Sequence, residues 1–205
     1  TNEKNMGNAY SRNKALQQSR GEFIAFMDDD DEWIDKNKLE KQQKFLRKNP
    51  LIKLVFTNVI ITDKKTYSKK VNCRIPKNIK KHFLGKNNLI YSPTVLTYRK
   101  ILLEVKGFDE KIKKGVDSDL FRNLILRRNI NIACINEFTT KIYEDDRDRM
   151  TRVNNRKKIF ISLHSQLYTL KKYSLNFIKY PIEILRRFYY ILLLLLKLAF
   201  PKLKK

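Results

Sequence analysis

The sequence predicts an α/β domain followed by a helical segment that is both basic and apolar. Two observations predict the domain. Short apolar runs alternate with helical patterns between residues 8 and 143, and four consecutive acids, residues 28–31, directly follow one of those runs. The third observation is a change of composition near residue 154, after which Glu183 is the only acid. We therefore divide the chain into residues 1–153 and residues 154–205.

The domain begins with a predicted helix and a predicted strand. Residues 8–19 have helical character, and Gly21 ends the helix. The compact apolar run within residues 22–27 then indicates a short buried strand that ends at polar residues. A strand that follows a helix at once is typical of layered α/β domains.

A second helix and a β-rich stretch come next. Asp35 is the expected N-cap of a helix that continues to about residue 48. The expected inner stripe of that helix consists of Leu39, Phe45 and Leu46. Residues 54–61 are rich in β-forming side chains, and residues 62–65 predict the turn that follows them.

The rest of the domain contains one more clear helix and two late strands. Residues 90–98 indicate an ordered strand or loop. A helix is predicted from the second acidic motif, residues 115–119, to about residue 128. The apolar runs at 130–135 and 139–143 indicate strands. The inner side chains expected of the helix are Leu120, Phe121, Leu124 and Ile125.

The four carboxylates at residues 28–31 point to a bound cation, because so much like charge on one turn is costly in a folded protein. They stand at the carboxyl end of a predicted strand, where open α/β sheets bind ligands. Mg²⁺ and Mn²⁺ prefer oxygen ligands, and Mg²⁺ typically uses one or two carboxylates together with substrate phosphates. The alternative is a solvated acidic turn that caps the helix beginning near Asp35. Trp33 favours a packed, fixed loop.

The second acidic motif allows two interpretations. Asp117 or Asp119 can serve as a helix N-cap. One of them can also act as a general base, because a carboxylate at a helix N-terminus is expected to keep a low pKa and to stay ionised. The two roles are compatible.

The formal net charge of +24 predicts a polyanionic partner: nucleic acid, anionic lipid headgroups or a phosphate-bearing substrate. A nucleic-acid-binding protein, or a metal-dependent nuclease, is therefore the competing class of function. No signature of an RRM, KH, zinc-finger or helix-turn-helix domain is present, and four clustered acids repel a phosphate backbone. Nucleic acid is therefore not the expected partner.

The two cysteines, Cys73 and Cys134, lie far apart without metal-binding spacing. We expect ordinary buried thiols and a reducing, cytoplasmic compartment. The C-terminal segment has apolar residues at helical spacing, at Ile159, Leu163, Leu167 and Leu170, and ends in an apolar run at 188–200 with basic flanks. This run is shorter than the about 20 residues of a spanning helix. It predicts a helix at an anionic membrane surface, on the inner face of the cell membrane, or alternatively a core helix.

Five motifs together resemble the middle of a family 2 glycosyltransferase with the GT-A fold. They are GNAYSRNKAL at 7–16, GEFIAFMDDDDEW at 21–33, KLE at 38–40, GFDE at 107–110, and GVDSDL at 115–120 with Arg122. The resemblance covers about residues 5–150. It implies a Rossmann-like mixed sheet with flanking helices. It also implies metal-dependent transfer of a sugar from a nucleotide-diphosphate sugar to an acceptor hydroxyl, usually with inversion, in cell-surface polysaccharide or lipid-linked glycan synthesis.

The resemblance also implies roles for individual residues. Asp28 and Asp30 are the outer residues of a DxD motif: Asp30 binds Mn²⁺ or Mg²⁺ directly, and Asp28 contacts the ribose or the metal. The expected donor-binding residues also include Arg12 and Asp29. Asp117 is the expected general base. The acceptor side is expected to contain Trp33 and Asp119, and the acceptor to be a glycan or a lipid-linked molecule.

The sequence departs from the family pattern in three places. Val116 stands where a Glu often precedes the base. Residues 143–151 contain no His to help hold the metal, and His82 and His164 are out of place, so the third metal ligand is unassigned. Members of the family begin with two βα units, and this chain starts after them. We therefore expect an exposed edge at strand 22–27, weak donor binding and little turnover by the isolated chain.

Overall fold

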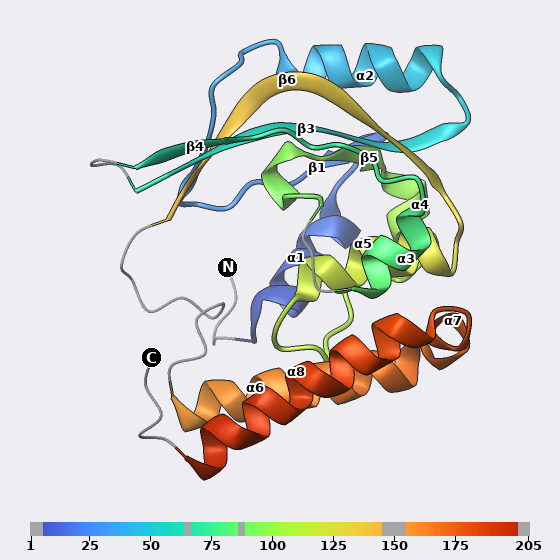
Figure 1. Ribbon diagram of the computed structural model, residues 1–205. Coiled ribbons are helices and arrows are strands. Elements are labelled where there is room, and N and C mark those ends of the chain that lie inside the picture. Colours follow the sequence, from blue (N-terminus) through green and yellow to red (C-terminus); the bar gives the residue numbers. More distant parts are fainter. Residues whose placement is uncertain (1–5, 64–66, 86–88, 145–154, 201–205) are drawn as a thin grey trace.

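The computed structural model describes residues 6–63, 67–85, 89–144 and 155–200, and it confirms an α/β fold built on a mixed sheet (Figure 1). The strands are β1 (Phe23–Ala25), β2 (Asp31–Trp33), β3 (Ile52–Thr62), β4 (Ser68–Val71), β5 (Leu96–Tyr98) and β6 (Asn131–Tyr143). Their order is β1-β5-β3-β6-β2, and β4 extends β3 as a hairpin. Among the described strands β1 pairs only with β5, so that it lies at the edge expected for it.

The central pair, β3 and β6, is parallel, whereas the other pairings are antiparallel. The sequence predicted two late strands, but β6 is one continuous strand. Its register against β3 shifts where Thr57 pairs with Ile135 and Asn58 pairs with Phe138. The Asn58 amide donates to the Asn136 side chain over 2.7 Å, so that polar groups at this bulge are satisfied and the strand continues.

The helices lie on both faces of the sheet. They are α1 (Asn8–Gln18), α2 (Lys38–Lys48), α3 (Ile79–Leu84), α4 (Arg99–Glu104), α5 (Val116–Leu126), α6 (Arg156–Lys172), α7 (Ser174–Ile178) and α8 (Pro181–Ala199), with a 3₁₀ turn η1 (Ser92–Thr94) before β5. Figure 1 shows α2 alone on one face and α1, α3, α4 and α5 on the other, with α6 to α8 as a further layer beyond them.

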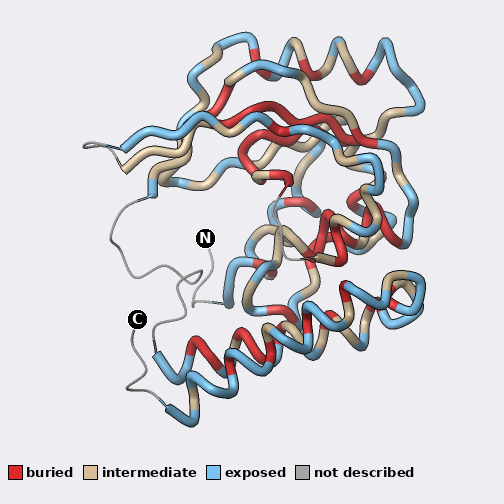
Figure 2. The backbone as a smooth tube through the Cα atoms, viewed as in Figure 1, coloured by how far each residue is buried: buried red, intermediate tan, exposed pale blue. Residues whose placement is uncertain are grey.

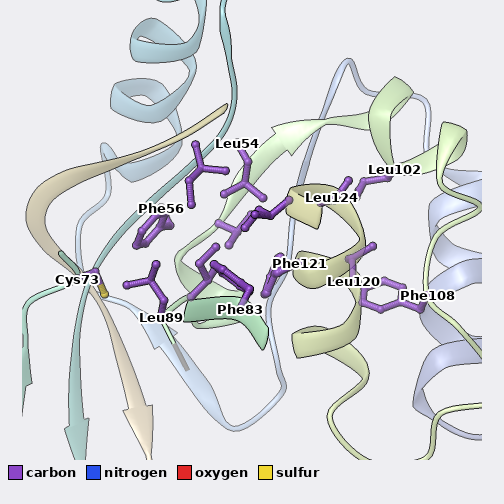
Figure 3. Close-up of a cluster of buried hydrophobic side chains, with 14 of the residues drawn as sticks. Leu54, Phe56, Cys73, Phe83, Leu89, Leu102, Phe108, Leu120, Phe121 and Leu124 are labelled. Carbon is purple, nitrogen blue, oxygen red and sulfur yellow. The ribbon is translucent and has the colours of Figure 1, made fainter. Parts of the chain in front are cut away.

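Alternation along β3 builds a core on each side of the sheet. Figure 2 shows that the middle of β3 is buried. Leu54 and Phe56 point into the larger cluster, which the side chains of α5 complete (Figure 3). Val55 points the other way, onto Leu46 of α2 and Leu96. The four inner side chains predicted for α5, Leu120, Phe121, Leu124 and Ile125, are all buried, which confirms the predicted helix face.

Helix α2 begins later and is rotated relative to the prediction. Its N-cap is Asn37, and the Asp35 carboxylate instead accepts from the Asn37 backbone N–H and the Lys41 ammonium. Leu39, predicted to face inward, is 40% exposed, whereas Lys38 and Gln42 are buried.

The partners of Lys38 and Gln42 explain this rotation. The Lys38 ammonium lies 4.5 Å from the Trp33 ring centroid and donates to the Gln42 side chain, which in turn donates to the Thr94 carbonyl. Burial lowers the pKa of Lys38 to about 8. These specific partners keep Lys38 and Gln42 buried, although the apolar Leu39 is the side chain that burial alone would favour.

The C-terminal helices form their own small cores and join the domain. Ile159 and Leu163 of α6 pack on Ile191 and Leu194 of α8, as helical spacing predicted for α6. Leu167, which has the same helical spacing, is 54% exposed. A second cluster, Leu84, Leu126, Tyr173 and Phe177, connects α3 and α5 to this layer. None of the helices in the described part of the chain is long and apolar enough to cross a membrane.

Candidate active site

Arg12, on α1, brings the two acidic motifs together. Its guanidinium donates through Nη2 to Asp28 and through Nη1 to Asp117, so that two carboxylates far apart in the sequence share one cation. The same guanidinium carbon lies 5.4 Å from the centroid of the Phe108 ring. A planar fork of donors suits two separate carboxylates better than a point charge does. The arrangement makes one site from the two motifs.

The turn after β1 carries the predicted donor-side residues. Asp28 follows the strand closely, and its carbonyl accepts from the Asp31 backbone N–H over 3.2 Å. The Asp28 side chain keeps 37% of its surface exposed; Asp29 is exposed and Asp30 is half-buried. This turn therefore presents carboxylate oxygens of the predicted DxD motif, which is a chemically suitable donor set for a hard divalent cation.

Helix α5 places Asp117 in its first turn and not at its cap. Gly115, with a left-handed φ of 75°, is the N-cap residue, so neither Asp117 nor Asp119 caps the helix as the sequence suggested. The expected low pKa of Asp117 is also wrong. Burial raises the pKa of Asp117, and the nearby Arg12 and a hydrogen bond with Ser92 oppose that rise only in part.

The turn η1 connects Asp117 to Trp33. The Trp33 indole N–H donates to the Pro93 carbonyl over 2.8 Å, and the neighbouring Ser92 hydrogen-bonds Asp117. This hydrogen bond confirms that Trp33 belongs to a packed segment. Sequence reasoning did not single out Ser92 or Pro93, because one Ser-Pro pair in a predicted loop has no periodicity that identifies it.

The GFDE motif fixes the wall beside Arg12. The Asn13 amide donates to the Phe108 carbonyl, and the Asn13 side-chain oxygen accepts from the Phe108 N–H over 2.7 Å. Gly107 has a φ of +66°, and a Cβ there would stand 2.3 Å from that oxygen, so only glycine fits. Phe108 meets Phe26 edge to face at 5.6 Å. The motif therefore holds the ring on which Arg12 lies.

Asp119 has a different environment from the one predicted. It is 2% exposed, and its carboxylate accepts from Lys172 over 2.7 Å and from the Tyr173 hydroxyl over 2.9 Å. Arg122 is a more distant partner at 3.9 Å. Asp119 thus joins α5 to α6, and the acceptor-side role expected for it does not enter our proposal.

The histidines and cysteines considered in the sequence analysis do not form a metal site in the described part of the chain. In the described ranges no three His, Cys, Asp or Glu side chains are grouped to hold a metal ion. His82 belongs to α3 and His164 to α6, and residues 145–151 of the segment without His lie outside the described residues. Cys73 and Cys134 are both free thiols; Cys73 is buried as predicted, whereas Cys134 is half-buried. Burial raises their pKa values to about 12 and about 11.

Comparison with known proteins identifies relatives of this chain. A sequence model described as glycosyl transferase family 2 matches residues 1–105. The chain is 33% identical over 181 residues to an uncharacterized glycosyltransferase of Methanocaldococcus jannaschii, covering 85% of this chain and 58% of that protein. It is 39% identical over 102 residues to the UDP-Glc:alpha-D-GlcNAc-diphosphoundecaprenol beta-1,3-glucosyltransferase WfgD of Escherichia coli, covering 50% of this chain and 39% of that protein. The chain thus spans 58% or less of these relatives.

The fold has counterparts among solved structures. A mannosyltransferase of Pyrobaculum calidifontis, solved in complex with GDP-Man and Mn²⁺, superimposes with a TM-score of 0.55 at 15% identity, covering 82% of this chain and 45% of that one. This likeness confirms the predicted GT-A type of fold. Because the family model matches 105 of the 205 residues, the chain belongs to glycosyl transferase family 2.

Proposed function

We propose that the protein transfers a sugar from a nucleotide-diphosphate sugar to an acceptor hydroxyl, with inversion at the anomeric carbon. The observation that carries this proposal is the pairing of Arg12 with both Asp28 and Asp117. In this pairing a carboxylate suited to the donor side contacts one terminal nitrogen of the guanidinium, and a carboxylate suited to act as a base contacts the other. A donor sugar and an acceptor have to meet between two such groups.

The donor side consists of Asp28, Asp29, Asp30 and Arg12. Asp30 and Asp28 would hold Mn²⁺ or Mg²⁺, because two carboxylates and a diphosphate together supply the oxygen ligands such ions prefer. The bound ion supplies positive charge where the diphosphate leaves. Arg12 donates to Asp28 and Asp117, and its remaining N–H groups, held beside the same turn, are available to phosphate oxygens. Asp29, which is exposed, contributes negative charge to the turn.

The acceptor side consists of Asp117 and the segment that holds it. Asp117 takes the proton of the acceptor hydroxyl as that oxygen attacks, on the side opposite the leaving diphosphate. Its raised pKa makes it a stronger base than an ordinary carboxylate, while Arg12 and Ser92 keep the ionised form accessible. Trp33 lies against the same turn η1 and offers an aromatic surface to a sugar.

The acceptor class is proposed from a relative and from helix α8. The Escherichia coli relative is named for a lipid-linked acceptor, a diphosphoundecaprenol. In α8 the buried stripe contains the charged residues Glu183 and Arg187, whereas the outer face is apolar and exposed. A helix on a water-facing surface normally exposes polar side chains. The exposed apolar side chains include Ile182, Leu185, Phe188, Leu192 and Leu196.

The exposed apolar face of α8 and the net charge of +24 favour an anionic membrane surface as a partner. We therefore place the protein at the cytoplasmic face of the membrane, where a lipid-linked acceptor is concentrated. The function is then a step of cell-surface polysaccharide or lipid-linked glycan synthesis.

Calorimetric titration tests the donor site. UDP-glucose and GDP-mannose are titrated with Mn²⁺ or Mg²⁺ present and again with EDTA. We expect weak but metal-linked binding of at least one donor, which Asp30→Asn and Asp28→Asn should each reduce about tenfold further. Glu137→Gln, which neutralises an exposed carboxylate paired with Lys41 outside the site, is the control.

Two results would overturn the proposal. One is the lack of any Mn²⁺ or Mg²⁺ uptake, with or without a donor. The other is tight DNA binding that falls steeply with salt and has no metal-linked nucleotide binding beside it.

A further inference from the structure

A cavity of about 900 Å³ lies between the C-terminal helices and the domain. Its walls come from α3 and residues 89–90, from the start of α5, and from the facing sides of α6 and α8. Gly115 and Ser118 line it, and these residues stand on either side of Asp117 in the chain. The cavity therefore adjoins the proposed base, although Arg12 and Asp28 are not among its lining residues.

The cavity contains buried polar atoms that nothing in the described chain satisfies. Four buried side-chain atoms of the described residues have no hydrogen-bond partner: His82 Nε2, Ser162 Oγ, Ser165 Oγ and Glu183 Oε2. All four belong to residues that line the cavity. Ser162, Ser165 and Glu183 are 1%, 4% and 2% exposed. Burying such groups unpaired costs about 1–3 kcal/mol each, so their gathering in one cavity indicates that a polar ligand pairs with them.

The mixture of donors and acceptors selects the chemistry of that ligand. Glu183 Oε2 needs a hydrogen-bond donor, whereas the two serine hydroxyls can donate or accept. Burial lowers the pKa of His82, although Glu183 opposes this, so that the neutral ring also has one acceptor and one donor nitrogen. An inorganic anion could satisfy the serines but would be repelled by Glu183. Hydroxyl groups of a sugar both donate and accept, and they satisfy all four atoms.

The walls and rim of the cavity add two further features. Phe83, Leu89 and Tyr189 provide apolar and aromatic surface of the kind on which the faces of a sugar ring pack. Lys81, Lys114 and Arg186 line the cavity as well, and Lys81 and Arg186 are exposed. Cations at an exposed edge suit a phosphate attached to that sugar.

We infer that this cavity binds the sugar of a glycosyl phosphate acceptor, with the sugar hydroxyls on Ser162, Ser165 and Glu183 and the phosphate at the cationic rim. This inference rests on the proposed transferase function, and it assigns the acceptor to the C-terminal helices. Residues 106–205, which lie outside the family match, contribute most of these groups. Tyr189 and Leu193 continue from the cavity toward the exposed face of α8, so that a lipid attached to the phosphate would lie on the membrane side.

Binding of soluble probes tests the inference. The chain is titrated, by calorimetry and by saturation-transfer NMR, with the 1-phosphates of glucose, galactose, mannose and N-acetylglucosamine. Methyl α-glucoside and inorganic phosphate serve as the two component probes. We expect at least one hexose 1-phosphate to bind about tenfold more tightly than inorganic phosphate.

Two serine variants distinguish a loss of binding from a loss of stability. Ser162→Ala and Ser165→Ala should each weaken hexose 1-phosphate binding about fivefold while leaving the melting temperature equal or higher, because each removes a buried, unpaired hydroxyl. Ser174→Ala, an exposed serine on α7, should change neither quantity. A merely structural role for the two serines would lower the melting temperature instead.

Three outcomes overturn the inference: no binding of any hexose 1-phosphate, equal binding of inorganic phosphate, or unchanged binding in both cavity variants. The first means a water-filled cavity and the second an anion site only. The donor titration with Mn²⁺ is run on the same preparations. Donor binding without saccharide binding refutes the cavity alone, whereas saccharide binding without metal-linked donor binding refutes the proposed transferase chemistry.

Discussion

At the scale of single residues, Arg12 decides the character of the site. Asp28 and Asp117 have 37% and 35% of their side-chain surfaces exposed, so that both are partly desolvated, and both depend on the same guanidinium. A partly buried carboxylate without a cation is costly. Arg12 thus stabilises the fold and holds the two halves of the site in place.

Removing Arg12 should therefore destabilise the protein, and a second change should restore it. We expect Arg12→Ala to lower the free energy of unfolding by about 1–2 kcal/mol, less than for a fully buried pair because both acids still contact water. Adding Asp117→Asn to Arg12→Ala should recover most of that loss, since the uncompensated charge is gone. Urea denaturation at pH 7 measures both effects.

The surface pair Arg47 and Glu22 provides the control for this cycle. Its side chains are 60% and 56% exposed, and Arg47→Ala should cost less than about 0.5 kcal/mol. A double variant that is no more stable than Arg12→Ala would contradict the assignment of Arg12 to the Asp117 charge.

At the scale of elements, one buried cluster joins α5 to α6. Lys172 donates to Asp119 and, over 2.6 Å, to Asp109 of the GFDE motif. The Tyr173 hydroxyl completes the cluster, and burial raises the pKa of Tyr173. Because these partners come from α6, from α5 and from the segment before it, the C-terminal helices are fastened to the wall of the proposed site.

Breaking this cluster should loosen the C-terminal layer in a graded way. Asp119→Asn leaves the buried ammonium of Lys172 with one carboxylate in place of two and should cost about 2–4 kcal/mol. Tyr173→Phe removes a single hydrogen bond and should cost about 1 kcal/mol. Thermal unfolding followed by circular dichroism checks the order of the two variants.

Tyr67→Phe is the matched control, because Tyr67 is 50% exposed and its ring lies on the outer surface. Its melting temperature should equal that of the unmodified chain. An Asp119→Asn variant as stable as this control would show that the buried cluster contributes nothing.

At the scale of the whole molecule, charge and apolar surface combine in the C-terminal layer. Helix α8 is a distinct surface element, since its inner stripe contains Arg187, which donates to the Leu84 carbonyl and to Gln166, while its outer face is apolar. An exposed apolar face beside basic residues such as Arg186 and Lys197 is suited to the boundary between lipid headgroups and acyl chains.

Vesicle sedimentation tests this surface without removing the helix. The double substitution Leu192→Ser/Leu196→Ser changes two exposed side chains, so the fold should persist while binding to phosphatidylglycerol vesicles falls about tenfold. Removing residues 186–205 is a less specific test, because it also deletes Ile191 and Leu194 from the core.

Leu51→Ser is the control, because Leu51 is 76% exposed and lies outside the C-terminal helices. Its binding to the same vesicles should be unchanged. Equal sedimentation of the double variant and the unmodified chain would remove α8 from the membrane contact.

Most helices and strands follow from local sequence patterns. The predictions are wrong where a contact with a residue distant in the sequence determines the local structure. The phase of α2 was mispredicted because Lys38 and Gln42 find Trp33 and the Thr94 carbonyl, which no pattern within the helix reveals. The break expected within β6 is bridged because Asn58 satisfies Asn136 from the neighbouring strand. Local apolar periodicity depends on burial alone, whereas these cases depend on specific partners.

The sequence by itself determined the α/β alternation, the two acidic motifs and the basic, apolar C-terminal helices, because each is a property of neighbouring residues. Only the tertiary structure decided which acid meets which partner. Arg12 joins Asp28 and Asp117, whereas Asp119, two residues further on, turns inward to Lys172. Adjacent side chains on a helix point in different directions, so that packing separates a candidate base from a buried structural anchor that shares its motif.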